Sequence, residues 1–220
     1  MDSMVKLSEQ EKSHIRELAT HVEAHTGVQV LAVVTGKSDA YPEVPWKAFS
    51  LGAALATLVL AIVASLGFGR HYAVPLLWVC ASLGSGMVLS LASIFLQPVA
   101  RSFLGKERAE EETRQFAQSL FLERGLDRTQ SRKALLILAS QFERRAAVVA
   151  DAGVIDRIPH AELENIAAAM NAALARGSTS AALAGGLSAL EELLLRRGFA
   201  SAAGGNEIPE EFLETGGPKS

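Results

Sequence analysis

Apolar residues are concentrated in the middle of the chain, and polar residues flank them on both sides. Lys47 is the last charged residue before this stretch, Arg101 is the first after it, and Arg70 is the only formal charge inside. A transmembrane helix needs roughly 20 apolar residues to cross a bilayer, and residues 48–69 and 72–100 are each long enough. The pattern therefore predicts a hairpin of two membrane-spanning helices, which satisfy their own backbone groups in lipid.

Both ends of such a hairpin lie on the same side of the membrane, so the two flanking segments share a compartment. Lys37 and Lys47 precede the first span. Four further basic residues follow the second span: Arg101, Lys106, Arg108 and Arg114. By the positive-inside rule, this bias predicts that the soluble portion is cytoplasmic. The alternative is a buried helical hairpin of a soluble protein, which the charge-free length disfavours.

The flanking segments show helix and strand patterns. Ser8 and Glu11 form a capping box, which predicts the start of a helix. Residues 28–35 and 133–140 are short apolar runs typical of strands covered on both faces. Residues 144–151 form a third predicted strand, and the short connection before it implies an antiparallel hairpin.

Helical spacing of apolar residues predicts three further helices after the membrane hairpin. The first covers residues 107–124, the second has Pro159 in its first turn, and the third covers residues 178–197 with Ser178 as its cap. Three or four strands covered by helices on both faces make an α/β sandwich.

These patterns together predict the domain organisation. Residues 1–47 and 101–197 form the two parts of one soluble α/β domain, and residues 48–100 form the membrane hairpin that interrupts it. Residues 198–220 are rich in glycine, alanine and acids, which predicts a flexible C-terminal tail.

Composition limits the function in three ways. A net charge of −3 over 220 residues gives no reason to expect nucleic-acid binding. Cys80 is the single cysteine, so neither a disulfide nor a cysteine metal cluster can form within one chain. The first 27 residues are polar and carry acids, so no signal peptide is expected there.

Small residues repeat at every fourth position in both predicted spans. Gly52 and Ala56 form such a row in the first span, and Ser82, Gly86 and Ser90 form one in the second. Rows of this kind let helix backbones approach closely. We expect them to bring the two spans together, rather than to line a pore or an oligomer seam.

Two segments of the soluble portion carry further motifs. The first, LSEQEKSHIRELATHVEAHTGVQVLAVVT, joins a Glu-rich helix to an apolar strand through Glu23, Thr26, Gly27 and Gln29. The second, LLILASQFERRAAVVADAGVIDRIP, contains the paired strands. Both resemble the TPM domain family, and Asn-Glu-Ile-Pro at 206–209 is similar to the tail of a bacterial membrane branch of that family.

The resemblance implies an α/β/α sandwich of three or four strands. It also implies acid phosphatase activity, as in a thylakoid lumen member, and calcium binding at an acidic loop, as in some members. Bacterial members are often linked to LemA-like membrane proteins. The resemblance therefore also implies a protein partner of that kind and a place in the bacterial inner membrane.

Charged residues surround the second and third predicted strands. Glu143, Asp151 and Asp156 offer the oxygen ligands that calcium prefers, and they are the candidate metal ligands. Arg144 and Arg145 would suit an anion or a partner surface. The favoured alternative is a hairpin whose charged ends are solvated, with Asp151 capping a turn.

A second cluster lies on one arc of the first predicted helix. It consists of His14, Glu17, His21 and His25. His21 and His25 have the i, i+4 spacing that can bind zinc, but the intervening Val-Glu-Ala does not make His-Glu-x-x-His, and Glu23 points elsewhere. No second ligand group is apparent in the sequence, so a solvated helix flank is the favoured interpretation.

The sequence contains no P-loop, EF-hand, dinucleotide-binding fingerprint or nucleophile elbow. It therefore identifies no catalytic residue, and we expect no required cofactor, with calcium possible by the resemblance. We expect a membrane-tethered, non-enzymatic interaction or accessory module in a membrane or envelope process, with the lipid bilayer and a protein as partners. The alternative is a metal-dependent, calcium-linked phosphatase at the membrane surface, which would need a convergent acidic or nucleophilic cluster.

Overall fold

The structure is a computed structural model that describes residues 6–66, 75–200 and 212–217. The chain divides into two compact units. One unit combines Met1–Ala40 with Glu107–Ser220, and the other is Tyr41–Lys106. The predicted turn around Arg70 lies outside the described residues.

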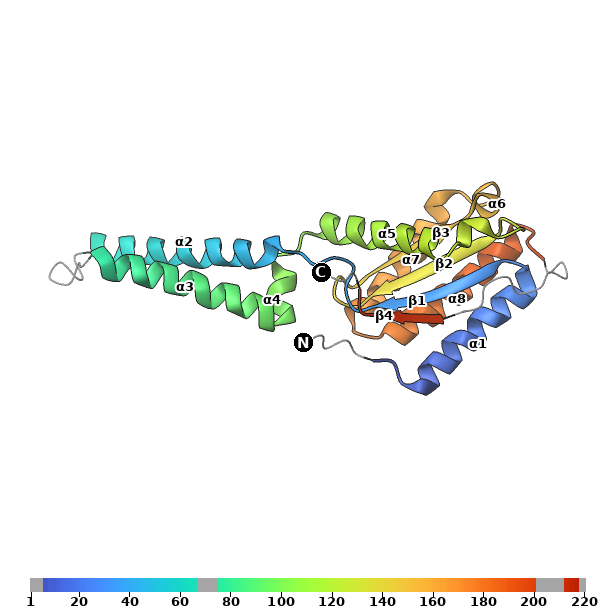
Figure 1. The fold of residues 1–220 in the computed structure, drawn as a ribbon, viewed down its shortest axis with the longest axis horizontal. Coiled ribbons are helices and arrows are strands. Elements are labelled where there is room, and N and C mark those ends of the chain that lie inside the picture. Colours follow the sequence, from blue (N-terminus) through green and yellow to red (C-terminus); the bar gives the residue numbers. More distant parts are fainter. Residues whose placement is uncertain (1–5, 67–74, 201–211, 218–220) are drawn as a thin grey trace. The chain divides into compact units, whose positions relative to one another are not determined.

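The first unit is an α/β sandwich. Its helices are α1 (Glu9–Thr26), α5 (Lys106–Glu123), the 3₁₀ helix η1 (Leu126–Arg128), α6 (Ala152–Ile155), α7 (His160–Ala175) and α8 (Thr179–Arg196). Its strands are β1 (Gln29–Thr35), β2 (Ala134–Ser140), β3 (Arg145–Ala150) and β4 (Phe212–Thr215). The four strands form one sheet in the order β3-β2-β1-β4 (Figure 1). The predicted α/β fold is confirmed.

Strand direction follows the lengths of the connections. β1 is parallel to β2 and to β4, whereas β2 and β3 are antiparallel. Ser140 pairs with Arg145 across the short turn, as the sequence predicts for this hairpin. Thr35, Ser140 and Thr215 therefore stand side by side at the carboxyl edge of the parallel strands.

Alternate residues of each strand enter two separate cores. Val30 and Ile137 pack toward α1, α7 and α8, whereas Leu31 and Leu136 pack toward α5. All four side chains are buried. Helices thus cover both faces of the sheet and give three layers (Figure 1).

Residues 212–215, within the segment 198–220 predicted to be a flexible tail, form strand β4, and residues 201–211 and 218–220 lie outside the described residues. Phe212–Thr215 pairs in parallel with the outer edge of β1. Phe212 packs against one core and Leu213 against the other. A free strand edge exposes unpaired backbone groups, and this short segment covers the edge of β1.

Helix starts match the sequence only in part. The capping box of Ser8 and Glu11 is present, and Gly27 ends α1 with a φ of 65°. Pro159 precedes α7 as its N-cap, and so does not lie in the first turn. Ser178 stands at the N-cap of α8, but its side chain makes no capping hydrogen bond.

The second unit is a helical hairpin. Its helices are α2 (Glu43–Ser65), α3 (Pro75–Phe95) and α4 (Gln97–Ser102). α2 and α3 are long and apolar enough to cross a membrane, and most of their residues are exposed. Many large apolar side chains, among them Leu58, Ile62 and Val88, face outward.

Small residues bring α2 and α3 together, as predicted. A Cβ atom added to Gly52 would lie 2.8 Å from the Ser85 carbonyl oxygen, and one added to Gly86 would lie 2.8 Å from the Phe49 carbonyl oxygen. Ser85 Oγ also donates to the Gly52 carbonyl at 3.1 Å. Larger residues at the two glycines would push the helices apart.

The span predicted over residues 72–100 is shorter than expected. α3 ends at Phe95, and α4 is a separate helix that begins at Gln97. Leu96 between them is extended. Pro98 explains the break, because its ring and missing N–H prevent a helix from continuing through this point. The first helix begins earlier than predicted, because α2 starts at Glu43 rather than at residue 48.

Candidate functional site

A groove of about 630 Å³ runs along β3 in the first unit. β3 is at the end of the strand order, so it has a sheet neighbour on one side only. Residues of α5 and α7, among them Glu107 and Glu164, complete the lining. Ala167 and Ala168 of α7 also line it, and their small side chains leave room beside the strand.

The backbone of β3 presents hydrogen-bonding groups to this groove. In an antiparallel pair, alternate residues direct their backbone groups away from the partner strand. The Ala146 N–H points away from β2 and donates to Asn171 Oδ1 at 2.8 Å. By the same alternation, Val148 and Ala150 turn their backbone groups toward the groove. Asn171 satisfies one donor, and the rest of the edge can accept another strand.

Part of the acidic rim of the groove is neutralised by basic partners. Glu110 pairs with Arg145 at 3.1 Å, and Glu111 pairs with Arg114 at 2.7 Å. The hydrogen bond from Gln115, followed by the one from Arg114, holds the pKa of Glu111 below its ordinary value. Glu111 therefore stays ionised at neutral pH.

Two further carboxylates leave the groove with a negative excess. Glu107 on α5 and Glu164 on α7 line it, and neither has an ion-pair partner among the residues that the structure describes. The groove therefore combines an open strand edge with an acidic rim.

The predicted metal ligand Glu143 lies in the β2–β3 turn and is buried. It accepts hydrogen bonds from the Ser38 N–H, at 2.8 Å, and from the Ser140 hydroxyl. Arg144 beside it has a φ of 53°, the left-handed conformation that the tight turn requires. Arg145 points to Glu110 of α5. Glu143 therefore joins the loop after β1 to this turn.

Asp151 lies at the other end of β3. Its side chain accepts from the Ala152 N–H at 2.7 Å, which caps α6, and it pairs with Arg132 at 3.0 Å. Asp156 is exposed at the end of α6. Because the length of β3 separates Glu143 from Asp151, the structure does not bring the three predicted metal ligands together.

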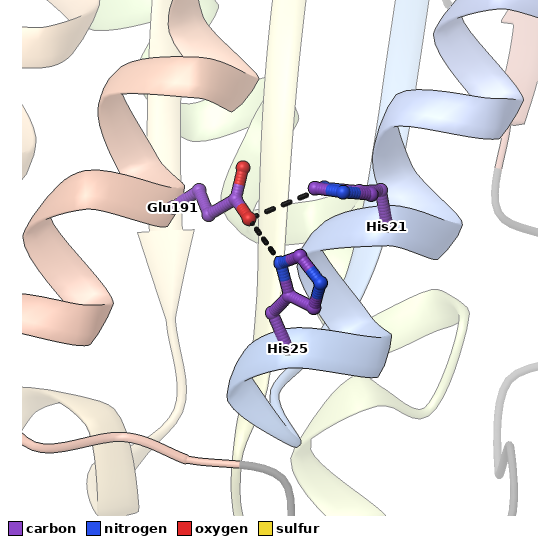
Figure 2. Close-up of side chains that lie close together, drawn as sticks. All are labelled: His21, His25 and Glu191. Carbon is purple, nitrogen blue, oxygen red and sulfur yellow. Dashed lines mark hydrogen bonds and ion pairs between the residues drawn. The ribbon is translucent and has the colours of Figure 1, made fainter.

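Three other side chains do converge, as Figure 2 shows. His21 and His25 of α1 both point to Glu191 of α8. Glu191 Oε1 lies 3.2 Å from His21 Nδ1 and 2.7 Å from His25 Nδ1. The two imidazole rings are 4.0 Å apart.

The other members of the predicted histidine cluster lie apart from this contact. Glu17 accepts a hydrogen bond from Ser13, and His14 is exposed. Glu23 accepts from the Val30 N–H at 2.7 Å, so it points elsewhere, as predicted. Sequence reasoning missed Glu191, which only the packing of α8 against α1 brings to the histidines.

Comparison with known proteins matches part of the chain to a family. Residues 100–193 match the family model of the TPM domain. This part of the chain is similar to a TPM domain. The match begins near the end of α4 and runs through α5, β2, β3 and α7 into α8, whereas α1 and β1 precede it. The resemblance inferred from the sequence motifs is therefore confirmed.

A solved structure supports the same fold. The chain is similar to the NMR structure of the BA42 protein from the psychrophilic bacterium Bizionia argentinensis, with a TM-score of 0.55 and 12% identity. The likeness covers 96% of this chain and 99% of that one. At this identity it shows the fold alone. The search of curated proteins found no match.

Proposed function

We propose that this chain is a membrane-anchored TPM domain that binds an extended basic segment of a partner protein along β3. The observation that carries the proposal is the open edge of β3 inside an acidic groove. The proposed role is binding, with no catalytic step. The family resemblance suggests a LemA-like membrane protein as the partner.

The anchor would be the hairpin of α2 and α3. Their apolar surfaces are exposed, and their lengths suit a bilayer. Within the first unit, Asp39 and Arg108 lie 3.6 Å apart, so the chain leaves and rejoins the sandwich at neighbouring points. The proposal puts the sandwich on the cytoplasmic face of a bacterial inner membrane, and the basic residues beside the spans support this side.

Strand addition accounts for the way the groove would bind. Main-chain hydrogen bonds to Val148 and Ala150 would give affinity for any extended segment. Glu107 and Glu164 would select lysine or arginine side chains in that segment. The small side chains of Ala167 and Ala168 would let the added backbone approach the strand.

The test uses the full chain in detergent micelles and a short peptide of alternating lysine and valine as the probe. We expect saturable binding, with the largest NMR shifts at the amides of Val148 and Ala150. The variant Glu107→Lys/Glu164→Lys should weaken binding on the order of tenfold, because two favourable ion pairs become repulsive.

Two controls separate the groove from general attraction between opposite charges. Glu123→Lys/Glu192→Lys makes the same change in charge outside the groove lining and should bind like the natural chain. A peptide of alternating glutamate and valine should bind far more weakly. Equal weakening in both double variants, or no shift at the β3 amides, would contradict the proposal.

The calcium-linked phosphatase remains the alternative expectation from the resemblance. It needs carboxylates that converge on one ion. The separation of Glu143 from Asp151 along β3 gives it no support.

A further inference from the structure

We propose that His21, His25 and Glu191 bind one zinc ion between α1 and α8. One ligand atom from each residue lies within 4.8 Å of the other two. These residues are not part of the β3 groove lining, so the site is independent of the peptide-binding proposal.

The distances are close to those of a zinc site. Zn–N and Zn–O bonds of about 2.0–2.2 Å in a tetrahedron put ligand atoms roughly 3.3 Å apart. Glu191 Oε1 is 3.2 Å and 2.7 Å from the Nδ1 atoms of His21 and His25. Small side-chain rotations would open a position between the three atoms.

Rigid elements hold the three ligands. His21 and His25 are one helical turn apart on α1, so their side chains share one face. α8 packs along α1, and Ser180 at the start of α8 donates to Glu11 at the start of α1 at 2.6 Å. This contact fixes the other end of the helix pair, so Glu191 stays opposite the histidines.

The donor set selects the class of metal. Imidazole nitrogen with carboxylate oxygen suits zinc and related transition metals, whereas calcium takes oxygen ligands. His21 and His25 side chains are 55% and 51% exposed, so solvent can reach the ion. Water would complete the coordination, and the ion would cross-link α1 to α8.

The experiment titrates zinc chloride into the full chain, prepared without a histidine tag in detergent, against a chromophoric chelator. We expect one zinc ion per chain. Glu191→Gln and His25→Ala should each weaken binding on the order of tenfold or more. Zinc should also raise the melting temperature of the natural chain by several degrees, because it binds only the folded state.

Matched controls come from the same two helices. His14→Ala removes an α1 histidine outside the cluster, and Glu192→Gln changes the neighbour of Glu191; both should bind zinc like the natural chain. Excess calcium should not displace the zinc. Circular dichroism of metal-free Glu191→Gln checks that this variant folds. Equal zinc binding by the natural chain and by His21→Ala/His25→Ala would overturn the proposal, and so would equal loss in His14→Ala.

Discussion

Glu143 carries a carboxylate but is only 6% exposed. Burial of a charge is costly unless hydrogen bonds replace its water. The Ser38 N–H and the Ser140 hydroxyl supply those bonds, and both residues are buried as well. The contact links two loops at the carboxyl edge of the sheet. These two hydrogen bonds explain how the Glu143 carboxylate can be buried.

Replacing this carboxylate should therefore destabilise the sandwich. Glu143→Ala should lower the free energy of unfolding by about 1–3 kcal/mol, because two buried donors lose their acceptor. Glu143→Gln keeps one acceptor oxygen and should cost less. Asp156→Ala, at an exposed position, should stay within about 0.5 kcal/mol. Chemical denaturation followed by circular dichroism checks the order, and a Glu143→Ala variant as stable as Asp156→Ala would contradict it.

For individual residues, the sequence predicts contacts between neighbours in the chain but not contacts with distant partners. The i, i+4 spacing of His21 and His25 is visible in the chain. Glu191 lies 166 residues after His25, and only the packing of α8 against α1 brings it close. Ser38 and Glu143 are 105 residues apart, so this hydrogen bond could not be predicted from the sequence either.

At the scale of elements, strong patterns were predictable and short ones were not. The apolar runs of β1 and β2 and the capping box of α1 have clear local signals. β4 has only four residues, too few for a clear alternation of apolar and polar positions. It forms a strand because it pairs with the free edge of β1. Pro98 is a local signal for the helix break at Leu96. The apolar composition continues past this point, however, and by itself predicts one unbroken span.

The helical hairpin should be separable from the sandwich. Replacing Tyr41–Lys106 with a short Gly/Ser linker should leave a soluble protein that unfolds cooperatively, because the two ends of the first unit already meet at Asp39 and Arg108. Gel filtration and thermal circular dichroism measure this outcome. An aggregated or non-cooperative product under several conditions would mean that the spans and the sandwich depend on each other for folding.

Across the whole molecule, two apolar helices lie between β1 and β2 of the sandwich, before the segment 100–193 that matches the TPM domain model. Exposed apolar surface of this extent usually marks a membrane or partner interface. Membrane anchoring would confine the acidic β3 groove to the bilayer surface and to partners found there.

Labelling of Cys80 in native membranes tests whether α2 and α3 are embedded in the bilayer. Cys80 is the single cysteine, and among the residues that the structure describes it is exposed on α3. In membrane fragments open on both sides, we predict that a membrane-impermeant maleimide labels Cys80 only after denaturation in detergent. Cys80→Ser/Ser188→Cys, with its cysteine at an exposed position of α8, should be labelled at once. Prompt labelling of Cys80 in native membranes, at the rate of this control, would contradict membrane anchoring.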